Sequence, residues 1–250
     1  MIIWTLIRRE VATRFGEGAL AYLWAIAVPL SWIGFGLVAF SMFERAIPVG
    51  GPPAVFLMSG ILPYVIFRQS VTYILRASQT NMGLLRVPGI CRWHQILAYA
   101  LLEALTCVAI CSLVILTTIW ITSAEPPQNP LVLGFAFVLA WVWGSIIGTV
   151  CACYADQHPS LTRIVPLALR PFFWISGVFF LARELPSDLQ KQLAMNPLFQ
   201  ITDLVREAWY WEYQSPIFSF QYQMLSTFAG VTLILAILLR FDASKQRAAP

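Results

Sequence analysis

Charged side chains are scarce in this chain. Asp, Glu, Lys and Arg together make up 11% of its 250 residues, whereas ordinary soluble domains carry roughly 25%. Hydrophobic residues make up 59%. There are two lysines, Lys191 and Lys245, and each is followed by glutamine. A soluble globular domain cannot be built from this composition, so the sequence predicts an integral membrane protein.

Common catalytic motifs are also missing from the sequence. It contains no G-x-x-x-x-G-K-[ST] phosphate-binding string, no HExxH and no GxSxG. Its two histidines, His94 and His158, have no carboxylate pattern around them, and its five cysteines lack the spacing of a metal site. We therefore expect no catalytic residue, no metal and no cofactor bound by this chain. In particular, the chain cannot hydrolyse ATP alone.

Six long apolar runs are present, and we interpret each as a transmembrane helix. They predict an all-α membrane protein of one domain, residues 1–250, with spans at 19–43, 54–77, 96–121, 131–154, 161–181 and 224–240. An even number of spans places both termini on one side. Ten Lys and Arg residues lie in the termini and in the loops after the second and fourth runs, and four lie in the opposite connections. The positive-inside rule then places both termini in the cytoplasm.

The first stretch, residues 1–18, has the pattern of an amphipathic helix. At 100° per residue its apolar side chains gather into one arc, and Arg8 and Arg9 lie outside that arc. Such a helix lies on a membrane surface, with its arginines toward anionic lipid or a cytoplasmic partner. Arg14 falls inside the apolar arc. Either its side chain snorkels to the interface, or it faces a protein groove or an anionic ligand.

The connection at 182–223 is longer than the other outer connections and carries helix signals. Pro186-Ser187-Asp188 begins one short helix, and Asn196-Pro197 ends it and begins another. The second helix has one apolar face but too many charged residues to cross the bilayer, which predicts a helical hairpin at the outer leaflet. The aromatic residues that follow form either an interfacial belt or a stacking surface for sugar rings, and they include Trp209, Tyr210, Trp211 and Tyr213.

Three ionisable residues lie inside the apolar runs: Arg68, Glu103 and Arg170. Counted along their helices, all three lie roughly 10 to 14 Å from the cytoplasmic ends. Charges at that depth are costly unless they are paired or face a water-filled path. One hypothesis is that Glu103 pairs with Arg170, so that Arg68 adds positive potential to a cytoplasm-facing cavity. The alternative is a salt bridge that serves packing alone.

Two further features concern packing and docking. The basic loop at 78–93 has room for one short helix under the membrane, and we expect it to dock to a partner. The fourth run carries small residues at strict four-residue spacing, which allow another helix to approach closely: Ala136, Ala140, Gly144, Gly148 and Ala152.

The chain resembles the membrane subunit of ABC-2 type exporters, and among them the capsular polysaccharide export permeases. Four strings carry the resemblance in order along nearly the whole chain: RREVATRFGEGALAYLWA from Arg8, ALLEAL around Glu103, VPLALRPFFWISGVFF from Val165 and MNPLFQITDLVREAW from Met195. The resemblance implies an interface helix at 1–18, a cytoplasmic coupling helix within 78–93 and a pair of periplasmic gate helices within 182–223. It also implies that Arg86, Arg92 and Trp93 contribute to ATPase coupling.

The same resemblance implies partners and a location. It implies a homodimer in a Gram-negative inner membrane, with two copies of a cytoplasmic ABC ATPase that binds ATP and Mg²⁺. The cargo would be a lipid-linked acidic polysaccharide, passed on to periplasmic co-polymerase-type and outer-membrane export proteins. No nucleic acid is expected, because the basic residues lie on one side of the membrane. The alternatives are an exporter of O-antigen, teichoic-type glycan or small molecules, a membrane-embedded glycosyl- or acyltransferase, and a scaffold that only docks partners.

Overall fold

The computed structural model describes residues 2–15, 19–44, 49–80, 92–155 and 157–247. Within these ranges every regular element is helical. The elements are α1 (Ile2–Phe15), α2 (Ala19–Met42), α3 (Pro53–Thr80), α4 (Arg92–Thr122), α5 (Pro130–Ala155), α6 (Leu161–Ile175), the 3₁₀ helix η2 (Ala182–Glu184), α7 (Ser187–Leu193), α8 (Pro197–Trp209) and α9 (Phe220–Arg247).

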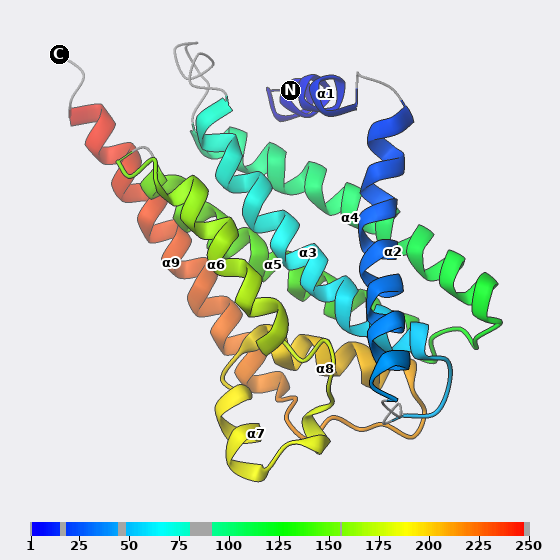
Figure 1. Cartoon of the computed structure of the whole chain (residues 1–250). Helices are drawn as coiled ribbons and strands as arrows, with labels where there is room; N and C mark the ends of the chain where they lie inside the picture. The colour runs from blue at the N-terminus through cyan, green and yellow to red at the C-terminus, as the bar shows by residue number, and fades with distance from the viewer. Residues whose placement is uncertain (1, 16–18, 45–48, 81–91, 156, 248–250) are drawn as a thin grey trace.

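The long helices form a bundle whose two ends are covered differently. Figure 1 shows α1 lying across one end of the bundle, while α7 and α8 lie at the opposite end. α1 packs against α4 and α2, and the hydroxyl of Tyr99 in α4 donates a hydrogen bond to the Glu10 carboxylate at 2.6 Å. Trp4 of α1 is 65% exposed. The predicted N-terminal helix is confirmed, with its end at Phe15.

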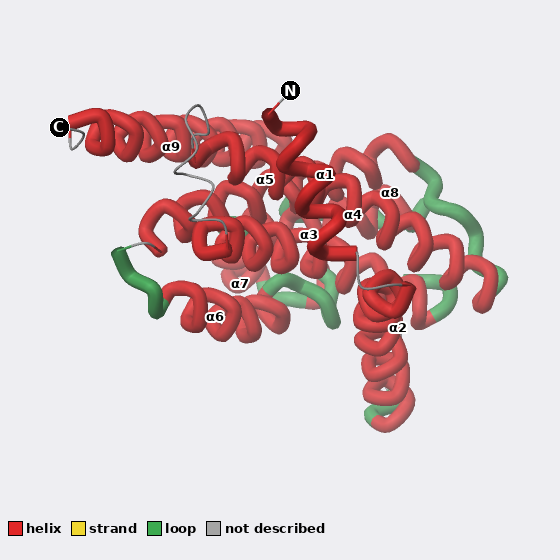
Figure 2. The backbone as a smooth tube through the Cα atoms, turned by 90° about the horizontal axis from the view of Figure 1, so that it is seen from above, coloured by secondary structure: helices red, strands yellow, loops and turns green. Residues whose placement is uncertain are grey.

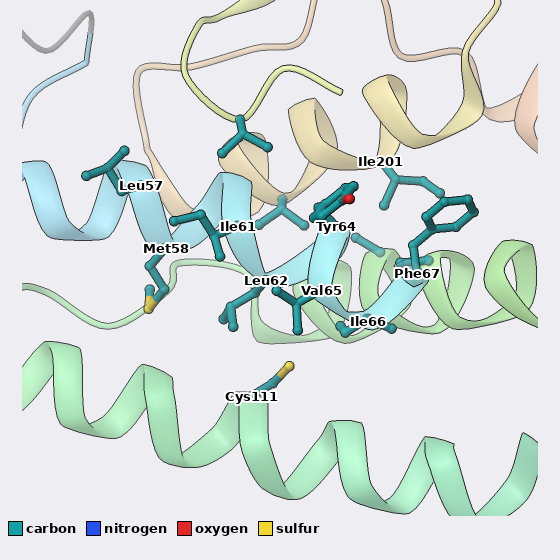
Figure 3. Packing of buried hydrophobic residues seen from close by; sticks show 14 of the residues in the cluster. Leu57, Met58, Ile61, Leu62, Tyr64, Val65, Ile66, Phe67, Cys111 and Ile201 are labelled. Carbon is teal, nitrogen blue, oxygen red and sulfur yellow. The ribbon is translucent and has the colours of Figure 1, made fainter. Parts of the chain in front are cut away.

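Helix α3 is the centre of the bundle. The most apolar stretch of α3 is 89% buried, against 39% or less for the other long apolar helices. Leu57, Met58 and Ile61 are completely buried, and Figure 3 shows them on α3, which lies between Cys111 of α4 on one side and Ile201 of α8 on the other. α3 also packs against α5, α2 and α6. α3 therefore positions α2, α4, α5, α6 and α8, whereas α9 packs against α5.

The small residues of α5 allow it to approach α3 closely, as predicted. A Cβ added at Gly144 would lie 2.6 Å from the carbonyl oxygen of Phe67, and one added at Gly148 would lie 3.0 Å from the Cβ of Ile74. Ala136, Ala140 and Ala152 are completely buried. The predicted packing stripe is confirmed, and its partner is α3.

Among the described residues, four helices are long and apolar enough to cross a membrane, judged by length and composition: Pro53–Arg76, Trp93–Thr122, Pro130–Ala155 and Phe220–Leu239. They match four of the six predicted spans. α2 is 24 residues long, and the part of it whose side chains are described, Ala27–Met42, is also apolar. The structure is therefore that of an all-helical membrane protein.

The fifth predicted span, 161–181, is wrong in its last part. α6 ends at Ile175, so its 15 residues extend about 22 Å, which is shorter than the roughly 30 Å hydrocarbon core. The chain leaves the helix at Ser176, and Gly177 then adopts φ +72°, a left-handed conformation that favours glycine. A Cβ at Gly177 would also collide with the Phe199 ring. The apolar residues that follow form an irregular buried segment rather than further helix.

Two helices, α7 and α8, lie at the other end, where the sequence predicts a helical hairpin. α7 begins at Ser187, directly after Pro186. The side chain of Asn196 caps α8 by accepting a hydrogen bond from the amide of Leu198 at 3.1 Å, and Pro197 occupies the first turn. Both helices therefore start where the helix signals of the sequence place them, and Asn196 supplies a side-chain cap.

Candidate functional site

A cavity of about 410 Å³ lies where α2, α3 and α6 meet. Figure 2 shows α2 and α6 on the same side of the molecule, apart from each other, and α3 packs against both. The polar and aromatic residues that line the cavity come from all three helices: Trp32, Tyr64, Arg68, Gln69, Arg170, Phe173 and Trp174. We call this the two-arginine cavity.

The two intramembrane arginines of the sequence meet in this cavity. Arg68 is half-buried on α3 and Arg170 is exposed on α6. Neither guanidinium has a hydrogen-bond or ion-pair partner within the part of the chain that the structure describes. Two charges of one sign that line the same largely apolar cavity repel each other, so the arrangement favours an anion.

Aromatic contacts fix the wall of the cavity. The ring of Phe173 on α6 lies 5.2 Å from the ring of Trp32 on α2 and 4.9 Å from that of Tyr64 on α3. The Tyr64 hydroxyl donates a hydrogen bond to the carbonyl oxygen of Leu169 at 2.7 Å. That carbonyl belongs to the residue before Arg170, so α3 fixes the backbone that carries the second arginine.

Glu103 lies elsewhere. It is completely buried in α4 and does not line the cavity, and its Oε1 accepts a hydrogen bond from the Cys107 thiol at 3.5 Å. Arg170, by contrast, faces the cavity. The hypothesis of a Glu103–Arg170 pair is therefore not supported. The sequence predicts a similar membrane depth for Glu103 and Arg170, but depth alone does not show whether two side chains on different helices face each other.

The predicted docking residues are only partly described. Arg8 and Arg9 are exposed on α1, and Trp93 at the start of α4 is 44% exposed and stacks on His94 with ring centroids 4.9 Å apart. The side chains of Arg14 and Arg92, and the whole of Arg86 with the predicted coupling helix, lie outside the described residues.

Three of the four predicted aromatic residues line a second cavity, of about 650 Å³, at the α8 end of the bundle. They are Trp209, Tyr210 and Trp211, and the cavity wall also includes Arg183 and two glutamates, Glu125 and Glu212. We call this the outer cavity. Tyr213 is not part of it.

Tyr213 belongs instead to a buried polar network that the sequence reasoning missed. Its hydroxyl donates to the carboxylate of Asp203 at 2.5 Å, and the hydroxyl of Ser215 donates to the other carboxylate oxygen. Burial raises the pKa of Asp203, although these hydrogen bonds and the nearby Arg206 oppose the shift. The signal was present in the sequence as Asp203 and Arg206, three positions apart on a helix that has one apolar face.

Arg206 is the centre of this network. It is completely buried, and it donates hydrogen bonds to the carbonyl oxygens of Phe180 at 2.6 Å and Val178 at 2.9 Å. Its guanidinium lies 4.4 Å from the centre of the Phe56 ring on α3. Burial lowers its pKa to about 10, so the group stays charged near neutral pH. The irregular segment after α6 thus obtains hydrogen bonds that a helix would have supplied.

Comparison with known proteins identifies the family. The family model described as "ABC-2 type transporter" matches residues 1–210. The polysialic acid transport protein KpsM of Escherichia coli is 31% identical, covering 94% of this chain and 90% of the relative. CtrC of Neisseria meningitidis, a capsule polysaccharide export inner-membrane protein, is 23% identical over 96% and 91%. RfbA of Klebsiella pneumoniae, an O-antigen export system permease protein, is 22% identical over 97% and 91%. The chain therefore belongs to the ABC-2 type transporter family, as a membrane subunit.

Proposed function

We propose that this chain is the permease of an exporter that moves lipid-linked acidic capsular polysaccharide outward across a bacterial inner membrane. The observation that carries the proposal is the two-arginine cavity, because Arg68 and Arg170 offer positive charge that no described residue pairs with and that an anionic cargo can neutralise. The names of the KpsM and CtrC relatives support a capsular cargo.

The energy for transport comes from another chain. A membrane subunit of this family pairs with an ABC ATPase, so ATP and Mg²⁺ bind to that partner, and the permease itself is not an enzyme. We propose that the ATPase docks on α1 and on the basic segment 78–93. Arg8, Arg9 and Arg14 would contribute from α1, and the second surface would use Arg86, Arg92 and Trp93.

We further propose that two copies of the chain face each other across the side that carries α2 and α6. Large apolar residues are exposed on these helices, including Phe35 at 59%, Leu167 at 60% and Trp174 at 59%. A second copy related by a two-fold axis would cover them and enclose the two-arginine cavity between the protomers.

The topology follows the charge distribution of the sequence. We propose six membrane crossings, made by α2, α3, α4 and α5, by α6 together with the irregular segment after it, and by α9, with both termini in the cytoplasm. The α7–α8 hairpin and the outer cavity then lie at the periplasmic surface. There Trp209, Tyr210 and Trp211 would stack on sugar rings before periplasmic co-polymerase-type and outer-membrane proteins receive the polymer.

Deletion in the native bacterium tests the proposal. We expect surface polysaccharide to disappear and to return with the wild-type chain, with Arg170→Lys returning most of it and Arg170→Gln little. Arg163→Gln is the matched control, because Arg163 is exposed near the start of the same helix but does not line the cavity. Unchanged surface polysaccharide after deletion would reject the proposal.

The likeness to RfbA supports O-antigen export as a second candidate function. The sugar composition of the polymer that disappears from the surface decides between the two candidates. A polymer attached to lipid A would identify O-antigen, and one independent of lipid A would identify capsule.

A further inference from the structure

Most of the polar groups that line the two-arginine cavity are hydrogen-bond donors. Arg68, Arg170 and the indole N–H groups of Trp32 and Trp174 donate only. Gln69 can both donate and accept, and the Tyr64 hydroxyl, whose proton is donated to the carbonyl oxygen of Leu169, can only accept from a ligand. Among the described residues, no Asp or Glu lines the cavity. Sugar hydroxyls need acceptors as well as donors, so this lining recognises an anionic acceptor better than a neutral sugar.

The size and the remaining walls of the cavity also point to a compact ligand. Its volume of about 410 Å³ lies within the range of small-molecule sites rather than that of a polymer conduit. Val28 and Val65 line it beside the arginines, and Val28 is 40% exposed on α2. A ligand there would place a charged group between two guanidinium groups and an apolar portion along α2.

From these observations we infer that the two-arginine cavity binds a phosphate-bearing lipid headgroup, with both guanidinium groups on the phosphate oxygens and the acyl portion along the α2 side. Guanidinium groups pair with phosphate through parallel hydrogen bonds, which strengthens the contact in a low-dielectric site. The inference rests on the proposed function in one respect: the lipid end of an exported glycolipid carries this chemistry. Bilayer phospholipid carries it too.

Binding to the purified complex tests the inference. The full chain, with its ATPase, is delipidated in detergent and titrated with dioleoylphosphatidylglycerol, and bound lipid is counted by native mass spectrometry. Dioleoylglycerol, which has the same acyl chains and no phosphate, is the ligand control. We expect saturable binding of the phosphatidylglycerol and about tenfold weaker binding for each of Arg68→Gln and Arg170→Gln. Arg163→Gln is expected to bind as the wild type does.

The folding of each variant is checked in a separate experiment. Each variant is compared with the wild type by size-exclusion chromatography, and Arg68→Lys and Arg170→Lys supply charge-preserving variants, which we expect to retain most of the binding. Equal affinity of the wild type and the glutamine variants, or equal binding of dioleoylglycerol, would overturn the inference. The proposed function would survive that result if deletion still abolishes surface polysaccharide.

A competition arm separates the two sources of phosphate. Lipid-linked polysaccharide extracted from the native bacterium is added to the complex loaded with phosphatidylglycerol. Displacement that depends on Arg68 and Arg170 supports binding of the cargo's lipid end. Retention of the phospholipid supports the phosphate-headgroup site, with bilayer lipid as its ligand, and overturns its assignment to the cargo.

Discussion

The guanidinium Nη2 of Arg206 donates a hydrogen bond to the carbonyl oxygen of Val178 at 2.9 Å, across 28 residues of chain. α3 accommodates this contact because residue 60 is glycine. A Cβ there would lie 2.6 Å from the same carbonyl oxygen and 3.1 Å from the same guanidinium nitrogen. One buried arginine thus joins α8, the segment after α6 and the central helix.

Replacing Arg206 tests its role in positioning that segment. Arg206→Met leaves the carbonyls of Val178 and Phe180 without their donor and Asp203 without a nearby cation, so we expect a loss of about 3 kcal/mol in the free energy of unfolding. Arg206→Lys keeps the charge but not the two-carbonyl geometry, and its loss is expected to be smaller. Thermal unfolding of the purified protein measures both. Arg163→Met is the control, since Arg163 is an exposed arginine on α6 outside this network. Equal melting temperatures of Arg206→Met and wild type would contradict the assignment.

The pH dependence of stability tests the buried carboxyl group of Asp203. Burial raises its pKa in the folded protein above the ordinary 3.8, so the folded state holds the proton more tightly than the unfolded chain. The stability that this proton contributes is complete below about 3.8 and is lost as the pH rises through the folded-state pKa. We therefore expect the melting temperature of wild type minus that of Asp203→Asn to fall with rising pH across this window. A difference that increases with pH would show that ionisation is favoured instead.

Two glycines of α5 provide a matched test of helix packing. A Cβ at Gly144 would lie 2.6 Å from the backbone oxygen of Phe67, whereas one at Gly134 would meet nothing within 4 Å. Gly144→Ala must push α3 and α5 apart, which costs about 1 to 3 kcal/mol. Gly134→Ala gains helix propensity at no steric cost, up to about 1 kcal/mol. Opposite signs in thermal unfolding are the expected outcome, and equal effects would show that the α3–α5 approach is not tight.

Much of the fold could be predicted because membrane helices follow simple rules. The length and hydropathy of the runs located the helices now called α3, α4, α5 and α9, and the small-residue spacing located the α5 face that meets α3. The starts of α7 and α8 followed from the helix signals at Pro186 and Asn196. All of these signals are local in the sequence.

The errors concern contacts between distant segments. An apolar run does not show whether it continues as a helix, so the end of α6 at Ile175 depended on Gly177, Phe199 and a donor in α8. The depth of a residue along a helix does not fix the direction in which its side chain points. The sequence therefore predicted one level for Arg68, Glu103 and Arg170, but it could not predict that Glu103 does not line the cavity. In the sequence Tyr213 cannot be distinguished from the neighbouring aromatic residues, because its hydrogen bond to Asp203 depends on the fold.

Two tyrosine hydroxyls test how firmly α6 is held beside the cavity. Tyr64, which is 4% exposed, donates to the carbonyl oxygen of Leu169 at 2.7 Å. Tyr222, which is 37% exposed, donates to that of Met195 at the same distance. Tyr64→Phe leaves a buried carbonyl with one donor fewer and is expected to cost about 1 kcal/mol. At Tyr222 water replaces the lost donor, so Tyr222→Phe is expected to cost less. The reverse order of melting temperatures would remove Tyr64 as a support of α6.

The outer cavity is tested by two tryptophans of equal exposure. Trp211 and Trp120 are both 83% exposed, but of the two only Trp211 lines the cavity. Truncating either to Ala removes few internal contacts, so both variants are expected to fold and reach the membrane at wild-type levels. If sugar rings stack on Trp211, Trp211→Ala lowers the export rate by about two- to tenfold, which is the range expected for one aromatic contact. Trp120→Ala leaves the export rate unchanged.

Export is measured as surface polysaccharide per unit of permease in the membrane. Equal rates for the two variants would show that the aromatic residues form an interfacial belt rather than a sugar-binding surface, because a belt depends on the number of rings and not on their place in the cavity.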